Sequence, residues 1–316
     1  MKAAYLGPEA SFSHQAALQI FYDSTTQLEA LPTFADIFEG VQSSQFEYGV
    51  VPFENSSNGT VVQLLDLLAD RQSKYSDVKV CAEHYLPVHH QLLVKQSGQD
   101  AVRQIRLEEA LTRIKKFYSH PQAWGQCSAF LSRNECRPIA RQDSSSTSEA
   151  ARVVSGNEAG TCAAIASELA GEQYGLVKLA HDIEDKGDNT TRFFVVARAG
   201  VALSQLAPEN GTGDSRNYKN LVSFTIDHES PGALADALSI FKKHGFNLTS
   251  INTRPSRLRS WHYVFFAECE QVCHQHRRDA ITNLISNLGD VVLSCRHLGS
   301  WEDQLIADWD QSRWCR

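Results

Sequence analysis

Two successive patterns of apolar residues divide the 316-residue sequence and limit what it can fold into. In the first part, short apolar segments alternate with amphipathic stretches, one of which has apolar residues at helical spacing from Val61 to Leu68. This alternation of strands and helices predicts an α/β domain with a largely parallel sheet. The candidate strands are residues 3–6, 48–51, 88–94, 116–118 and 192–197. A further helix is predicted where Ser146 and Glu149 form a capping box.

A polar, glycine-rich segment at residues 207–217 has no apolar period and indicates a linker. The sequence after it predicts a compact βαββαβ unit of the ferredoxin-like type. Ser230 is the expected cap of its first helix, with Pro231 in the first turn. Its expected strands are residues 221–226, 248–254, 263–267 and 291–295, and its second helix is residues 280–288. The expected divisions are a first domain at 1–200, a linker at 201–217, a second domain at 218–300 and a tail at 301–316.

The composition is that of a globular protein, with 42% hydrophobic and 21% charged residues. A net charge of −7 argues against a general nucleic-acid binder, because phosphate neutralisation needs clustered Lys and Arg. No apolar run is long enough to span a membrane. The N-terminus indicates a first strand rather than a signal peptide, so a cytoplasmic protein is expected.

The eight cysteines are scattered through a long chain, which favours reduced thiols over a disulfide framework. Cys269, Cys273, His274 and His276 are close enough in sequence to suggest a zinc site. Four residues so close together rarely surround a tetrahedral ion by themselves, and a strand end followed by a polar loop is the simpler interpretation. We therefore expect no metal and no cofactor.

The first of four candidate functional segments runs from Gly7 to Ser13, between a strand and a helix. A helix N-terminus offers free backbone N–H groups and the positive end of a dipole, which suit a carboxylate near Ser11 and Phe12. The segment lacks the glycine patterns of dinucleotide and P-loop sites. Taken alone, it is more simply interpreted as a capped helix.

The second segment, residues 54–61, also lies between a strand and a helix. It is rich in polar side chains, and ligands of α/β folds bind at the carboxyl ends of strands. Asn, Ser and Gly also form ordinary turns, but the density of polar groups favours a site. The candidates here are Glu54, Asn55, Ser56 and Gly59.

The third and fourth segments are residues 119–127 and 189–193. In the third, Ser119 ends a strand, and a helix from Pro121 would put Gln122 and Gln126 on one face. In the fourth, Thr191 can donate a hydrogen bond, and Arg192 before Phe193 can hold a carboxylate by two parallel bonds. Four segments that offer neutral donors predict a pocket for a polyanionic small molecule.

The motifs G-P-E-A-S-F-S, E-N-S-S-N-G, S-H-P-Q…Q-C and N-T-T-R-F occur in the order found in prephenate dehydratases, which this chain resembles. The resemblance implies a catalytic domain like a type-2 periplasmic binding protein. Its lobe 1 would comprise about residues 1–78 and 183–200, and its lobe 2 about residues 79–182. The implied reaction removes water and carbon dioxide from prephenate to give phenylpyruvate, on the route to phenylalanine.

The family's motif residues match this sequence at Glu54, Asn55, Gln126 and Thr191. The resemblance implies that Thr191 hydrogen-bonds the departing hydroxyl, while Asn55 and Gln126 orient the substrate and stabilise developing charge. Glu54 is the implied candidate for positioning or proton handling. The further implied substrate contacts are Ser11, Phe12, Ser56, Gly59, Ser119, Arg192 and Phe193.

Gly232-Ala233-Leu234 before the first helix and Asn247-Leu248-Thr249 in the second strand match the motifs of ACT domains, regulatory modules that the C-terminal unit resembles. The resemblance implies that phenylalanine binds between the ACT domains of two subunits and inhibits, so a homodimer or homotetramer is expected. The chain reads Asn252-Thr253-Arg254-Pro255 where family members often have E-S-R-P. The implied effector-binding residues are Gly232, Ala233, Leu234, Asn247, Thr253, Arg254 and Pro255.

Two other functions fit the same sequence. One is arogenate dehydratase, which performs the same elimination on the aminated substrate and shares these motifs. The other is a non-catalytic sensor with a binding cleft, which needs no donor aimed at a leaving group. Thr191 next to the loop from Glu54 to Gly59 favours the enzyme.

Overall fold

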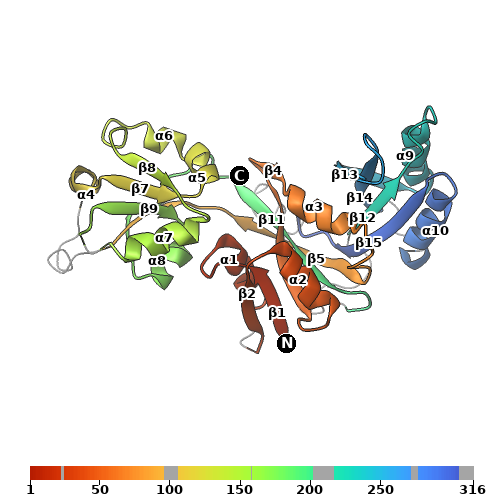
Figure 1. Cartoon of the computed structure of the whole chain (residues 1–316), viewed down its shortest axis with the longest axis horizontal. Helices are drawn as coiled ribbons and strands as arrows, with labels where there is room; N and C mark the ends of the chain where they lie inside the picture. The colour runs from red at the N-terminus through yellow and green to blue at the C-terminus, as the bar shows by residue number, and fades with distance from the viewer. Residues whose placement is uncertain (23–24, 96–105, 158, 202–216, 272–276, 306–316) are drawn as a thin grey trace, which may run out of the picture.

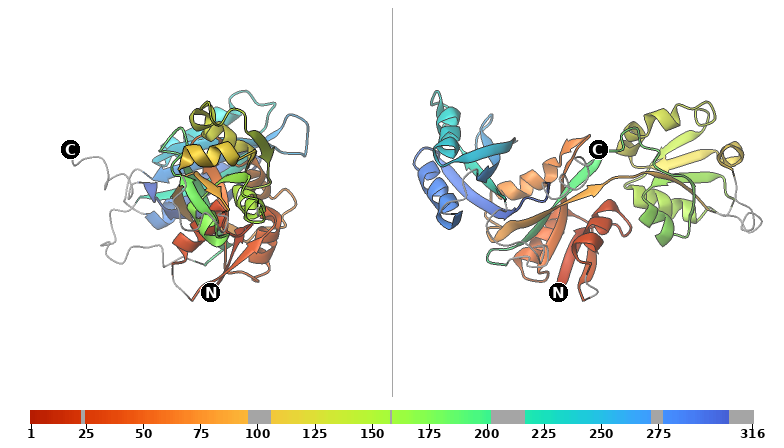
Figure 2. Two further views of the ribbon diagram at one scale, coloured as in Figure 1. Left: turned by 90° about the vertical axis from the view of Figure 1, so that its left-hand side faces the viewer. Right: turned by 180° about the vertical axis from the view of Figure 1, so that it is seen from behind.

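Three units lie in a row along the long axis of the molecule (Figure 1). Lobe 1, red to orange, is in the middle, with lobe 2, yellow to green, on one side and the C-terminal unit, teal to blue, on the other. Viewed along this axis, the three units overlap (Figure 2, left). The computed structural model describes residues 1–22, 25–95, 106–157, 159–201, 217–271 and 277–305.

Lobe 1 is a mixed sheet with helices on both faces. β1 is parallel to β2 and β3, whereas β11 is antiparallel to both of its neighbours, β3 and β5. Helix α1 packs with Ala3 and Tyr5 of β1, and α2 and α3 pack on the opposite face with Ala4. The elements are β1 (Lys2–Leu6), α1 (Phe12–Ile20), β2 (Gln27–Leu31), α2 (Phe34–Gln42), β3 (Tyr48–Asn55), β4 (Gly59–Thr60), α3 (Val62–Ala69), β5 (Val78–Pro87) and β11 (Thr190–Arg198).

Lobe 2 has its own five-stranded sheet, in the order β10-β6-β9-β7-β8. The pairs β7–β8 and β7–β9 are parallel, and β6 is antiparallel to both of its neighbours. The elements are β6 (Gln91–Val94), α4 (Leu107–Arg113), β7 (Lys116–Ser119), α5 (Pro121–Gln126), α6 (Ser128–Leu131), β8 (Ala140–Asp143), α7 (Thr147–Ser155), β9 (Cys162–Ala166), α8 (Glu168–Gln173) and β10 (Val177–Ala180).

The C-terminal unit has the predicted βαββαβ order. Its helices pack on one side of the strands around Phe224, Phe241 and Leu284. The elements are β12 (Tyr218–Thr225), α9 (Ala233–Lys243), β13 (Phe246–Pro255), β14 (Tyr263–Gln271), α10 (Arg277–Gly289) and β15 (Ser294–Glu302). Gly232, with φ of 89°, precedes α9, so Ser230 is not the helix cap that the sequence predicted. By contrast, the predicted cap of α7 is confirmed, because Ser146 Oγ accepts from the Glu149 N–H at 2.9 Å, although the Glu149 carboxylate pairs with Arg152 rather than completing a capping box.

Lobe 1 and the C-terminal unit share one ten-stranded sheet, in which β15 lies beside β5. The two strands meet in parallel at Gly299 and Val80. Gly299 has φ of 148°, and a Cβ there would overlap the carbonyl oxygen of Val80. Only glycine therefore permits this close approach of the two backbones.

Five charged side chains are buried where these two units meet. Arg192 of β11 contacts the carboxylates of Glu83 and Glu268, the latter at 2.7 Å. Lys219 contacts Glu83 at 3.1 Å and Asp303 at 2.7 Å. Burial alone would lower the pKa of Arg192, but the charges of Glu268 and Glu83 raise it instead. These groups satisfy one another's charges, which makes their burial possible.

Three expectations about lobe boundaries and strands are wrong. The sheets are mixed rather than largely parallel. The expected strand 88–94 is only β6, because residues 88–90 pass from lobe 1 to lobe 2 after β5 ends at Pro87. β5 belongs to the lobe 1 sheet, so that lobe does not end at residue 78. The long β5 extends towards lobe 2 (Figure 2, right).

The last strand is Ser294–Glu302 rather than residues 291–295. It pairs along β12, so the backbone ladder decides its extent although many of its side chains are polar. Trp301, which was assigned to a tail, lies in this strand and is only 1% exposed. Its ring packs 5.1 Å from that of Phe194 in lobe 1.

The described cysteines are all free thiols, and several are deeply buried. Burial raises the pKa of Cys81 to about 12, so this thiol stays protonated at neutral pH. Cys273, His274 and His276 lie outside the described residues. Within the described ranges, no helix is long and apolar enough to cross a membrane.

Replacing Gly299 by alanine should separate β15 from β5, because the added methyl group overlaps Val80. We expect a loss of about 1–3 kcal/mol in the free energy of unfolding, as is typical of overpacking. The matched control is Gly289→Ala, whose Cβ would lie 3.9 Å from Cys295 Sγ. Thermal unfolding measures both, and equal melting temperatures would contradict the close approach.

Replacing Arg192 by methionine leaves Glu83 and Glu268 buried with fewer positive partners. Loss of one partner from a buried ion pair should lower the free energy of unfolding by about 3–5 kcal/mol. Arg198→Met on the same strand is the control, because its ion pair with Asp77 is 45% exposed on both sides. That change should cost about 1 kcal/mol or less. Urea unfolding compares them, and equal losses would refute the structural role of Arg192.

Candidate active site

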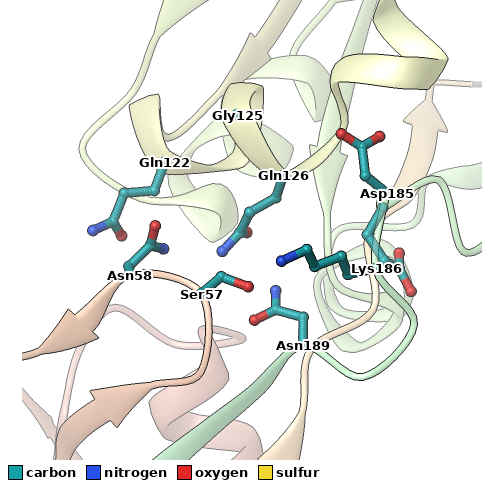
Figure 3. A pocket seen from close by; sticks show the side chains of 9 residues that line it. Ser57, Asn58, Gln122, Gly125, Gln126, Asp185, Lys186 and Asn189 are labelled. Carbon is teal, nitrogen blue, oxygen red and sulfur yellow. The ribbon is translucent and has the colours of Figure 1, made fainter.

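A cavity of about 600 Å³ lies between the two lobes. Lobe 1 supplies the segment after β1 and the loop between β3 and α3, and lobe 2 supplies α5 and the start of α7. Between the lobes, His90 and two residues of β11, Thr191 and Phe193, also line it. A neighbouring hollow of about 260 Å³ shares Asn58, Gln122 and Gln126 with this cavity (Figure 3).

Asn55 and Thr191 form the best-defined contact in the cavity wall. They lie opposite each other where β3 and β11 pair, although 136 positions separate them in sequence. Asn55 Nδ2 donates to Thr191 Oγ1 and to Asn189 Oδ1, both at 2.9 Å. Because Thr191 Oγ1 accepts this bond, its own O–H is available to donate elsewhere. Asn55 Oδ1 also accepts from the N–H groups of Ser57 and Asn58, which shapes the following loop.

The alternation of side chains along β11 decides which residues face the cavity. Thr191 and Phe193 line it, and Arg192 between them points to the opposite face of the sheet. The expected substrate contact of Arg192 therefore does not appear, because its guanidinium is buried among Glu83 and Glu268. Glu54 pairs with Arg192 in register and does not line the cavity either.

The other expected contacts divide into two groups. Ser11, Phe12, Gly59 and Gln126 line the cavity. Ser11 also caps α1, since its Oγ accepts from the His14 N–H at 3.2 Å. Ser56 and Ser119 are used for structure instead: Ser56 Oγ accepts from the Thr190 N–H at 2.9 Å, and the fully buried Ser119 donates to the Ile165 carbonyl at 2.7 Å.

Gln126 comes from α5, the helix that begins after Ser119. His120 caps this helix, because its Nδ1 accepts from the Gln122 N–H at 3.3 Å. Gln126 Oε1 lies 2.7 Å from Nε2 of the buried His90. The amide nitrogen of Gln126 points into the space near Ser57 and Lys186 (Figure 3).

Several lining residues were not expected from the sequence. His90 was hidden inside the predicted strand 88–94, although the pair His89-His90 interrupts an apolar run. Ser146 and Thr147 were recognised only as part of a helix start, and Ser145 was not singled out. Lys186 lines the smaller hollow and is the only lysine or arginine among the described residues lining either space.

The described residues offer one set of three possible metal ligands, His89, Asp182 and Glu184. His89 Nδ1 is already 2.7 Å from a Glu184 oxygen, and the other Glu184 oxygen accepts from the His90 N–H at 2.8 Å. These contacts already fix the connection between the lobes, so we assign no metal to it.

The expected effector residues lie at two ends of the C-terminal unit. Gly232, Ala233 and Leu234 form the start of α9, which follows the end of β12 at the same end as Thr253. Asn247 is near the start of β13 at the other end, bonded to Glu270 at 2.9 Å. Thr253 is six residues further along, about 20 Å on an extended strand. Next to it, Arg254 forms two 2.9 Å hydrogen bonds with Asp66 of α3, and Arg71 donates to the Pro255 carbonyl.

Comparison with known proteins divides the chain into the same two regions, a catalytic region and a C-terminal domain. A prephenate dehydratase family model matches residues 3–200, and an ACT domain model matches residues 225–272. The bifunctional chorismate mutase/prephenate dehydratase of Aquifex aeolicus is 35% identical over 98% of this chain and 75% of that protein. A probable prephenate dehydratase of Saccharomyces cerevisiae is 36% identical over 85% of this chain and 86% of that protein.

Among solved structures, a prephenate dehydratase from Arthrobacter aurescens in complex with L-Phe superposes with a TM-score of 0.77. It is 27% identical, and the match covers 96% of this chain and 90% of that one. The motif residues Asn55, Gln126 and Thr191 line one cavity in the region that the family model matches. The chain therefore belongs to the prephenate dehydratase family of lyases and carries an ACT domain after its catalytic region.

Proposed function

We propose that the cavity between the lobes converts prephenate to phenylpyruvate, with Thr191 hydrogen-bonded to the departing hydroxyl. The observation that carries this proposal is the 2.9 Å hydrogen bond from Asn55 Nδ2 to Thr191 Oγ1. It fixes the threonine side chain and leaves its O–H as a donor. The cavity also has room for a small dicarboxylate, at about 600 Å³.

The chemistry requires alignment more than strong acids or bases. The bond to the ring carboxylate breaks, and its electron pair completes the aromatic ring as the carbon–oxygen bond opposite breaks. The products are carbon dioxide, phenylpyruvate and a hydroxide that takes up a solvent proton to become water. Thr191 holds its own proton too tightly to be a general acid near pH 7, so its role is to stabilise the leaving oxygen electrostatically.

Neutral donors and one cation can hold the two carboxylates. Ser11 lies at the N-terminus of α1, where the helix dipole favours an anion. Gln126 offers amide N–H groups from lobe 2, and the Lys186 ammonium points into the adjoining hollow (Figure 3). Glu54 lies outside the cavity and receives no proton-transfer role.

Two other functions of the cleft, arogenate dehydratase and a non-catalytic sensor, would give different results in substrate assays. An arogenate enzyme would turn over the aminated substrate faster than prephenate, and a sensor would bind without turnover. The hydroxyl donor that Asn55 fixes in the cavity favours an enzyme. Parallel assays with both substrates separate the three.

We further propose that phenylalanine binds at the ACT domain and inhibits, in a cytoplasmic homodimer or homotetramer. Asn247 and Thr253 lie at opposite ends of β13, so a second ACT domain is needed to complete a site from both ends. Three contacts connect this strand to the catalytic lobe: Asn252 with Thr60 at 3.1 Å, Arg254 with Asp66, and the Pro255 carbonyl with Arg71. Thr60 lines the cavity, so a shift of β13 would reach the substrate site directly.

Replacing Thr191 by alanine should lower kcat by about 100-fold or more, the usual effect of losing one such donor. Thr190→Ala is the matched control, since that hydroxyl donates to the Asp188 carbonyl at 3.2 Å and does not line the cavity. The assay follows phenylpyruvate absorbance in proteins of equal melting temperature. Wild-type turnover in Thr191→Ala would end the assignment.

Replacing Asp66 by asparagine should weaken inhibition by phenylalanine, because it removes a charged link between β13 and α3. Glu149→Gln is the control, since that carboxylate pairs with Arg152 on α7 of lobe 2. Inhibition curves give the comparison, and an unchanged curve for Asp66→Asn would exclude this link.

Stability against pH should differ between wild type and Asp66→Asn. Hydrogen bonding to Arg254 lowers the pKa of Asp66 from 3.8 to about 2. The folded state therefore gains from this group above pH 3.8 and loses that gain as the pH falls towards 2. The difference in stability between the two proteins should shrink over this window in urea titrations, and a constant difference would contradict the ion pair.

A further inference from the structure

His90 occupies a special place in the chain, at the passage from β5 to β6 where lobe 1 connects to lobe 2. Its backbone is bonded to the second connection between the lobes, at Ile183 and Glu184. Its N–H donates to Glu184 Oε2 at 2.8 Å, and its carbonyl accepts from the Ile183 N–H at 3.0 Å. The residue is 1% exposed and lines the cavity, with its ring edge-on to Phe12.

The imidazole of His90 has one hydrogen-bond partner among the described side chains. Its Nε2 lies 2.7 Å from Gln126 Oε1, while its buried Nδ1 has no partner in the described part of the chain. A carbonyl oxygen only accepts, so the proton of a neutral imidazole lies on Nε2. A second proton on Nδ1 would be a buried N–H without an acceptor, which proteins rarely leave. Burial also lowers the pKa of His90, which likewise favours the neutral ring.

This contact decides which end of the Gln126 amide faces the substrate. With Oε1 held by His90, the NH2 group of Gln126 points into the hollow near Ser57 and Lys186 (Figure 3). A carboxylate substrate needs donors there and would be repelled by an amide oxygen. Without His90, the amide could rotate by half a turn and present the wrong end.

We propose that His90 is a positioning residue for the reaction: it holds the Gln126 amide with its N–H groups towards the substrate. The inference rests on the proposed function for its effect on turnover. The tautomer and the hydrogen bond on which it depends can be tested without turnover. The residue connects lobe geometry to substrate binding, because it lies in one connection between the lobes and its backbone is bonded to the other.

The first test is spectroscopic and uses the full-length wild-type protein without substrate. Nitrogen-15 NMR of the histidine side chains should show one neutral ring protonated at Nε2 that is absent from His90→Gln. Loss of the Gln126 carbonyl in Gln126→Leu should shift this Nε2 resonance. A His90 ring protonated at Nδ1, or an Nε2 resonance indifferent to Gln126→Leu, overturns the inference whether or not the protein turns over prephenate.

The second test is a double-mutant cycle with prephenate. His90→Leu and Gln126→Leu should each lower kcat by about 10- to 100-fold, the scale for misplacing one donor to a charged group. The double variant should be no slower than Gln126→Leu alone, because His90 acts through Gln126. His90→Gln, whose amide can donate from a similar reach, should recover part of the lost activity.

His244→Leu serves as the control, since it removes a histidine bonded to Asn287 at 2.7 Å in the C-terminal unit. It should leave kcat unchanged in the absence of phenylalanine. The positioning role is overturned if the fold-losses of kcat in the two single variants multiply in the double variant. Full activity in a folded His90→Leu protein overturns it as well. If the folded wild type shows the expected NMR signature but does not turn over prephenate, the proposed function is refuted while the His90–Gln126 contact is supported.

Discussion

The buried contact of Arg192 with Glu83 and Glu268 is the constraint on which the arrangement of the molecule depends. A guanidinium so deeply buried is tolerable only with its carboxylates present, and these come from lobe 1 and from the C-terminal unit. The same contact fixes the face of β11 that turns away from the cleft. Because side chains alternate along a strand, Thr191 and Phe193 must then face the cavity. One ion cluster thus joins two units and orients the residue next to it.

The two lobes also touch at places other than their covalent connections. Ser148 of α7 donates to the Glu9 carbonyl, and Ser167 donates to the Ala10 carbonyl at 3.4 Å. Ala10, with φ of 57°, is packed against lobe 2 side chains such as Val154. The segment after β1 therefore belongs to both lobes, and the cavity is enclosed from more than one side. A substrate held there contacts groups whose relative positions these bonds already restrict.

Much of this organisation could be predicted from the sequence, and the exceptions share a physical cause. The βαββαβ order and the helix cap at Ser146 follow from local patterns, and both are confirmed. Thr191 and Asn55 both line the cavity, because the polar end of β3 and the polar start of the antiparallel β11 meet there. The sequence could not tell which face Arg192 takes, since that depends on Glu268 in a distant unit. β5 was missed because its buried Glu83 interrupts an apolar run, and only the ion cluster explains that burial.

The junction of Gly299 with Val80 is a very short strand pairing within the large sheet. Adjacent ladders run over many residue pairs, but β15 and β5 are registered at one pair. β5 in turn pairs along its length with β11, the strand that carries Thr191. A rotation of the C-terminal unit would thus reach the cleft through the backbones of β5 and β11 as well as through the ion cluster around Arg192.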